Sequence, residues 1–295
     1  MEFNYNNSKR HHYLPQFYLK GFLNDKNTFA IYDKKREVLK KGEYSPESHF
    51  FESHRNTISI LGDKTDFIET VLYSKIDDDL APFFQKLRSL DQNFLSFENL
   101  FPIKMFISFL YWRLPVNDKL ISDQIQDLTL EQLGLVSKNE NLTVEELNNG
   151  WNTLKGMPFF EKILPLILPY ETFKISPHKG EELYWKGIFD FGDKTITSDN
   201  PIILKDPNQY YEKSQIIIVP ISKNKRVVYG SFSNHVKLTG EFNLLCDLVI
   251  IDQAHNYVCC SNKDYLIDLI KLHTEYCRMN KMEQVKKELF DFFIE

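Results

Sequence analysis

The segment that decides the fold is Ser96-Phe-Glu-Asn-Leu-Phe-Pro-Ile-Lys-Met-Phe-Ile-Ser-Phe-Leu-Tyr-Trp112. Wound as a helix it is apolar on nearly every side, which predicts a central, buried helix. Ser96 is a favourable N-cap residue, and Leu114-Pro115 disfavours a longer helix. The apolar window from 100 to 114 contains Lys104 and Arg113, and it is shorter than the roughly 20 residues that span a membrane. We therefore expect a soluble protein built around this helix.

Helical periodicity continues on both sides of this segment. Residues 63–90 repeat apolar side chains at spacings of three and four, which predicts a long amphipathic helix that Pro82 bends or splits. Thr143 and Glu146 form a capping box that predicts a helix to Leu154. Two further helices are expected before the sheet region, at residues 118–135 and 157–168.

The periodicity changes near residue 170. Short β-branched and aromatic runs predict strands at 186–191, 194–197, 201–204, 216–219 and 226–230. Helical spacing returns at Thr239, and an amphipathic stretch runs from Asp264 to Phe293. We predict an α+β fold, mostly helical, with a small antiparallel sheet formed by residues 170–231.

The domain organisation predicted from this order is one compact unit over residues 1–295. It contains a helical subregion (1–169), a sheet subregion (170–231) and C-terminal helices (239–295). An independent sheet domain is the alternative, since the chain length fits either arrangement.

Composition excludes several classes of protein. The chain has 295 residues, of which 42% are hydrophobic and 26% charged, as in ordinary globular proteins. Its net charge of -5 argues against broad nucleic-acid binding through phosphates. Its four cysteines form no CxxC pair, and the N-terminus has no apolar signal segment. These features predict reduced thiols, a cytoplasmic location and no membrane partner.

Chemically able side chains are densest in Lys9-Arg10-His11-His12-Tyr13-Leu14-Pro15-Gln16-Phe17-Tyr18-Leu19-Lys20-Gly21-Phe22. Pro15 and Gly21 mark the start and end of a short helix. The two histidines precede its N-terminus, where the helix dipole disfavours the imidazolium and lowers the pKa of a histidine.

Four other polar residues are candidates for a site. Arg113 follows the buried helix, where a guanidinium needs an anionic partner or caps free carbonyls. Glu69 lies early in its helix, where complementing the dipole is the simpler role. Asp199 and Asn200 lie at a strand-to-turn junction, which often displays functional groups, but an Asx-turn explains them as well.

Familiar catalytic signatures are missing or broken. GxGxxG, P-loop and HExxH patterns are absent. Ser198-Asp199-Asn200 matches one β-lactamase element, yet the nearest upstream SxxK serine, Ser176, precedes a proline and is too close. His49 and His54 would share a metal only on a loop, and surface histidines are the favoured interpretation.

Five of these motifs, taken in order, resemble the family catalogued as domain of unknown function 4238. The matching segments are His12 to Phe22, Phe67-Ile68-Glu69, Arg113-Leu114-Pro115, Thr197 to Pro201 and Pro220-Ile221-Ser222. The resemblance implies a cytoplasmic, mostly bacterial protein and supplies no reaction. It also leads us to expect a second acidic group two turns after Glu69, where Asp77-Asp78-Asp79 stands. An aspartate there is shorter than expected, which weakens a metal role.

Two functions of different classes fit these residues. The first is a hydrolase or nuclease acting on a phosphoester. Its catalytic residues would be His12, Glu69 and Asp199, and its phosphate-containing ligand would contact Arg113, Asn200 and His11. The second is a non-catalytic module that binds a small anionic ligand or a partner protein. The sequence specifies neither a metal nor a cofactor. A site requires His12, Glu69, Arg113 and Asp199 to surround one pocket.

Overall fold

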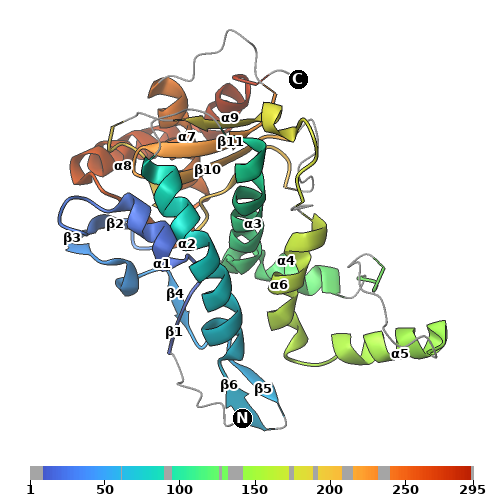
Figure 1. The fold of residues 1–295 in the computed structure, drawn as a ribbon. Helices are drawn as coiled ribbons and strands as arrows, with labels where there is room; N and C mark the ends of the chain where they lie inside the picture. The colour runs from blue at the N-terminus through green and yellow to red at the C-terminus, as the bar shows by residue number, and fades with distance from the viewer. Residues whose placement is uncertain are drawn as a thin grey trace.

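The computed structural model describes residues 9–60, 62–89, 95–125, 128–131, 142–172, 176–188, 192–207, 215–231 and 240–293. Helix α3 (Phe97–Arg113) runs through the middle of the molecule (Figure 1). Buried residues lie on all its sides, including Lys104, which pairs with Glu181 at 2.8 Å. The predicted central helix is therefore confirmed, with its internal charge neutralised.

The helices around α3 match the predictions in most places. They are α2 (Ser74–Ser89), α4 (Asp118–Ile125), α5 (Val144–Lys155) and α6 (Phe160–Thr172). The capping box of Thr143 and Glu146 is confirmed at the start of α5. Residues 126–127 and 132–135 of the predicted third helix lie outside the described residues, and residues 128–131 are not helical.

The long helix predicted from Asp63 begins later. Asp63–Thr65 is strand β6, which pairs with β5 (Ile58–Ile60), and a π-helical segment, Ile68–Tyr73, then leads into α2. The pairing of β5 with β6 supplies backbone hydrogen bonds to residues that the apolar spacing alone had placed in a helix. Pro82 lies inside α2 without ending it.

The strands form two four-stranded antiparallel sheets and two pairs. The first sheet has the order β7 (Trp185–Ile188), β11 (Lys225–Tyr229), β10 (Ile217–Ser222) and β9 (Ile203–Leu204). The second has the order β3 (Val38–Tyr44), β2 (Phe29–Asp33), β12 (Tyr257–Cys260) and β8 (Thr197–Ser198). The α+β class and the antiparallel sheet of the 170–231 region are confirmed. Only β8 of that region joins the second sheet.

The C-terminal region consists of α7 (Gly240–Gln253), α8 (Lys263–Arg278) and α9 (Met282–Phe290) (Figure 1). Helix α7 contacts β9 of the first sheet and β8 of the second, and α8 contacts β2 and β12 of the second sheet. The amphipathic stretch predicted from Asp264 is two helices, because Asn280 takes a left-handed conformation with φ 53°. The second sheet joins segments of all three predicted subregions. The single-domain interpretation stays a prediction.

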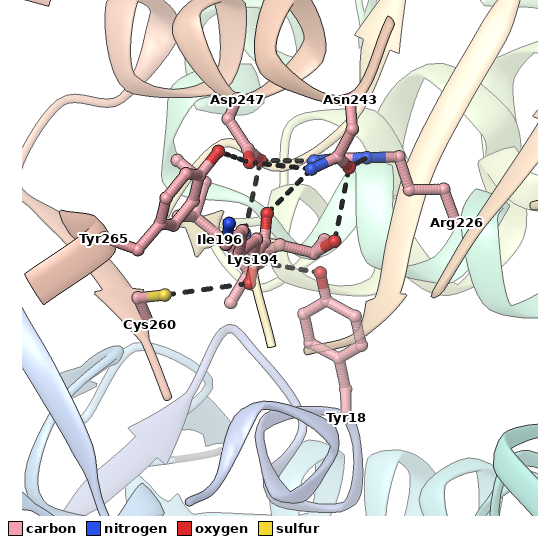
Figure 2. Close-up of polar contacts among 10 residues, drawn as sticks. Tyr18, Lys194, Ile196, Arg226, Asn243, Asp247, Cys260 and Tyr265 are labelled. Carbon is pink, nitrogen blue, oxygen red and sulfur yellow. Dashed lines mark hydrogen bonds and ion pairs between the residues drawn. The ribbon is translucent and has the colours of Figure 1, made fainter. Parts of the chain in front are cut away.

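A buried polar network ties β11, α7 and α8 together (Figure 2). Arg226 pairs with Asp247, and both side chains are fully buried. Asn243 accepts a hydrogen bond of 2.8 Å from Arg226, and the hydroxyl of Tyr265 donates one of 2.7 Å to Asp247. A buried ion pair is tolerated only when its remaining donors and acceptors are used, as most are here.

The N-terminal motif packs against the first sheet. Strand β1 (Arg10–His12) pairs with β4 (Phe51–Ser53), and α1 (Gln16–Leu19) continues as a 3-10 turn, Lys20–Phe22. Arg88 donates hydrogen bonds of 2.7 and 3.1 Å to the carbonyls of Phe17 and Tyr18. The Gly21 carbonyl accepts one of 2.7 Å from the Lys223 amide, next to β10. The predicted short helix is thus confirmed and docked on the sheet.

Two further findings concern membrane-spanning helices and the state of the cysteines. No helix among the described residues has the length and apolar character needed to cross a membrane. All four cysteines are free, three of them buried and Cys277 exposed.

Candidate functional site

Three of the predicted site residues come together in space. Arg113, at the C-terminal end of α3, has its Nη2 atom 3.8 Å from Oε1 of Glu69. His12, from β1, lies close enough to both for their charges to act on its imidazole. The cluster of His12, Glu69 and Arg113 therefore joins residues from three segments far apart in the chain.

His11 and His12 contact different parts of the structure, as neighbouring residues of a strand do. The ring of His12 packs on Phe51 at 5.5 Å between centroids. His11 is fully buried, and its Nδ1 accepts a hydrogen bond of 2.8 Å from the amide of Asn56. Its Nε2 lies 3.6 Å from Asp66. His11 thus fixes the loop that carries Asn56, and its predicted ligand contact stays a prediction.

The side chain of Asn56 connects this loop to Glu69. Its amide Nδ2 donates a hydrogen bond of 2.6 Å to Oε2 of Glu69. Glu69 lies in the π-helical segment before α2. One carboxylate oxygen of Glu69 is therefore held by Asn56, while the other is turned toward Arg113.

The guanidinium of Arg113 is almost completely buried and is held on several sides. Its Nη1 donates hydrogen bonds of 3.0 and 3.1 Å to the two carboxylate oxygens of Asp77, and its plane lies over the ring of Tyr73 at 4.1 Å. Burial opposes the charge, but Asp77 and Glu69 outweigh it and raise the pKa of Arg113. The anionic partner expected for this arginine is thus Asp77 together with Glu69. Its buried Nε has no partner among the described residues.

His12 is the most unusual member of the cluster. It is 9% exposed, and its buried Nε2 has no hydrogen-bond partner among the described residues. Burial lowers the pKa of His12, Arg113 lowers it further, and Glu69 opposes both. The predicted direction of the shift is right, but its main cause is burial, because α1 has only four residues. His12 is therefore neutral at pH 7.

A pocket of about 350 Å³ adjoins the cluster. Asn56, Tyr73 and Arg113 form part of its wall. Of the four residues expected to surround one pocket, Arg113 lines it and His12, Glu69 and Asp199 do not, so the expected convergence is not found at this pocket. The wall carries three cations and three carboxylates, namely Arg55, Arg113, Lys162, Glu52, Asp118 and Glu161. Arg55 is paired with Glu52 at 2.7 Å and with Asp118, while Lys162 donates to the Arg55 carbonyl. Burial and then Arg55 lower the pKa of Lys162.

Comparison with known families places this cluster in context. The family model described as "Protein of unknown function (DUF4238)" matches residues 10–264, which is most of the chain. The chain belongs to the DUF4238 family. No curated protein and no solved structure matches it.

The DUF4238 match covers Asp199 and Asn200, but these two side chains hold a turn. The Asp199 carboxylate accepts hydrogen bonds of 2.9 and 2.6 Å from the amides of His255 and Asn256. Burial raises the pKa of Asp199 in spite of these bonds. Asn200 donates a hydrogen bond of 3.2 Å to the carbonyl of Gln253. No contact within the described residues brings either side chain to the His12 cluster, and the turn interpretation fits their geometry.

The histidine pair between the first two DUF4238 motifs does not converge. His49 is buried, with Nε2 2.8 Å from Lys40 and Nδ1 2.8 Å from Ser48. Burial and then Lys40 lower the pKa of His49 to about 4. His54 instead lines the pocket.

Of the residues that hold this cluster, Asn56 escaped the sequence analysis, whereas Asp77 was named there through the family resemblance. Asn56 gave no signal, because its role depends on a loop fixed by His11. Asp77 had one, since it lies two turns after Glu69, where the family resemblance called for an acidic group. In the part of the chain that the structure describes, the cluster does not bring three metal-ligand atoms to one point.

Proposed function

We propose that the protein is a hydrolase acting on a phosphoester, a class that includes nucleases, with His12 as its general acid-base. The observation that supports this most is the buried Nε2 of His12, which has no hydrogen-bond partner among the described residues and belongs to a ring on which the charges of Glu69 and Arg113 act. A buried polar atom without a partner is unfavourable, and such atoms are common where a ligand or a reaction supplies the missing contact.

The roles follow from the charges. Neutral His12 accepts a proton from water as the water oxygen bonds to phosphorus. The bond from phosphorus to the ester oxygen breaks, and the His12 imidazolium gives its proton to that leaving oxygen. Glu69 stabilises the transient imidazolium, because its negative charge favours protonated His12. Arg113 belongs both to this cluster and to the pocket wall, and it attracts the phosphoryl oxygens. Asp77 holds Arg113 in place for this contact.

The alternative is a non-catalytic module that binds a small anionic ligand or a partner protein. One observation favours it: Arg113 is already engaged by Asp77 and faces Glu69, so a ligand must compete with two carboxylates. A sensor tolerates such competition better than an enzyme that needs rapid turnover.

One pair of assays separates the two functions. Wild-type protein is incubated with bis(4-nitrophenyl) phosphate and with 4-nitrophenyl phosphate, and its melting temperature is measured with and without inorganic phosphate. Turnover of either ester supports the hydrolase. A phosphate-dependent rise in melting temperature without turnover supports the binding module, since a ligand of the native state stabilises it. If the protein shows neither turnover nor a rise in melting temperature, that result contradicts both functions.

The cytoplasm is the compartment we propose for this activity. All four cysteines are free, and Cys277 is exposed. Exposed free thiols persist in a reducing compartment.

A further inference from the structure

A second cluster of reactive side chains lies among the C-terminal helices (Figure 1). It consists of Asp252, near the end of α7, with His273 and Cys277 on α8. His273 and Cys277 are four residues apart and so occupy one face of their helix. One ligand atom from each residue lies within 4.8 Å of the other two. Neither the His12 cluster nor its pocket includes any of them.

Two of the three distances within this cluster match those of a tetrahedral metal site, and the third, between Cys277 and Asp252, is within 4.8 Å. Nε2 of His273 lies 3.4 Å from Oδ1 of Asp252 and 3.4 Å from Sγ of Cys277. Zinc bonds of about 2.0–2.3 Å at tetrahedral angles separate neighbouring ligand atoms by about 3.3–3.6 Å. A single ion fits between these three atoms with small side-chain adjustments.

We propose that Asp252, His273 and Cys277 bind one zinc ion, with the fourth position left to water on the exposed side of Cys277. A thiolate and an imidazole favour zinc over magnesium or calcium, which prefer oxygen ligands. Three protein ligands and one open position are also typical of zinc sites that exchange a ligand. This site is independent of the proposed phosphoester chemistry.

Two neighbouring lysines contact Asp252, Lys286 at one carboxylate oxygen and Lys34 at the backbone. Nζ of Lys286 lies 3.3 Å from Oδ2 of Asp252, which leaves Oδ1 for the ion. Lys34 donates a hydrogen bond of 2.5 Å to the backbone carbonyl of Asp252. Contacts of this kind orient metal-binding carboxylates. The two lysine charges oppose the ion, while the charges of thiolate and carboxylate together balance it.

The same three residues also resemble a nucleophilic cysteine with its histidine and carboxylate. In a catalytic triad the carboxylate contacts the histidine nitrogen that faces away from the nucleophile. Here Asp252 and Cys277 both lie 3.4 Å from Nε2 of His273, so the geometry is better suited to a metal, which displaces the thiol proton as it binds. His273 and Cys277 lie beyond residue 264, where the family match ends.

Cobalt is a spectroscopic substitute for zinc that tests this site directly. Full-length protein without a polyhistidine tag is titrated with Co²⁺, and the thiolate-to-cobalt charge-transfer absorption is recorded. We expect this band to saturate at about one equivalent and to decrease when zinc is added. Cys277→Ser should abolish it and His273→Gln should weaken it, while a matched change of an exposed histidine elsewhere, His255→Gln, should leave it unchanged.

Alkylation provides a second readout that does not depend on cobalt. Iodoacetamide should modify Cys277 at neutral pH, and zinc should slow that modification at least tenfold, measured by peptide mass spectrometry. The buried Cys246, Cys259 and Cys260 are internal controls for folding, because they react only if the chain opens. No charge-transfer band, a band that survives Cys277→Ser, or alkylation that zinc does not slow would each overturn the proposal.

Discussion

Nη1 of Arg113 donates hydrogen bonds to both carboxylate oxygens of Asp77, joining the end of α3 to the start of α2. The contact links the central helix α3 to α2, which directly follows the π-helical segment that carries Glu69. Because the guanidinium is 4% exposed, losing the partner leaves a charge that water solvates poorly. The pair therefore determines both stability and the position of Arg113 in the candidate site.

Asp77→Asn tests this relationship. The substitution keeps the shape of the side chain but removes its charge, and it should lower the free energy of unfolding by about 1.5–3 kcal/mol, the range for a hydrogen bond to a charged group. Urea denaturation measures the change. Asp79→Asn is the matched control on the same helix, since Asp79 pairs with Lys75 at the surface. Its loss should be much smaller, and equal losses would contradict a special role for Asp77.

His12 should make stability depend on pH in a defined direction. Its pKa in the folded protein lies below the ordinary value of 6.5, so the unfolded chain binds the proton more readily. The contribution of His12 to the free energy of unfolding is then fully present above pH 6.5. It is lost as the pH falls through the folded pKa, with a slope of at most about 1.4 kcal/mol per pH unit.

His12→Gln should flatten this dependence, measured by urea denaturation at a series of pH values. His49 will still contribute at lower pH, because its pKa is also lowered. Identical slopes for wild type and variant between pH 6.5 and 5 would show that His12 is not held neutral by burial.

Gly21 should resist substitution for a steric reason. A Cβ atom there would lie 2.7 Å from the carbonyl oxygen of Ile221 and 2.8 Å from the side chain of Arg88. Gly21→Ala should therefore destabilise by about 1–3 kcal/mol, as overpacking does. Gly150→Ala, in α5, meets nothing within 4 Å and should stabilise by about 0.5–1 kcal/mol. Thermal unfolding of both variants checks the opposite signs.

The central position of α3 is tested by a pair of phenylalanines on that helix. Phe106 is 2% exposed and Phe101 is 44% exposed. Phe106→Ala should lower the free energy of unfolding by about 2–5 kcal/mol, the range for large-to-small changes in a core. Phe101→Ala should change it by less than about 0.5 kcal/mol. Similar values for the two would mean that α3 is not the centre of the core.

The features that were predictable from sequence depend on local signals. The apolar residues on all sides of α3 form a pattern within one continuous segment, and so does the capping box of Thr143 and Glu146. The partner of β8 was not predictable, because Thr197–Ser198 pairs with β12, some sixty residues later in the chain. A two-residue strand carries too little pattern to identify that partner.

In the candidate site, too, some residues were predictable from the sequence and others were not. Arg113 was found because a charge after a buried apolar run needs a partner, His12 because titratable residues are dense around it, and Glu69 because it lies early in its predicted helix. Asp199 was found from its place at a strand-to-turn junction, yet its carboxylate accepts hydrogen bonds from the amides of His255 and Asn256. Residue type and turn position cannot tell an oxygen that binds a neighbouring loop from one that faces a ligand.

The most direct measurement is kcat/KM for a phosphodiester, bis(4-nitrophenyl) phosphate, in His12→Gln and His49→Gln prepared identically. The two histidines are matched in burial, being 9% and 7% exposed, but His49 contacts Lys40 and Ser48. We predict that His12→Gln lowers kcat/KM by about 10²–10⁴-fold, the usual contribution of a general acid-base, and that His49→Gln stays close to wild type. Equal activity in the two folded variants would contradict the assignment of His12 as the catalytic residue.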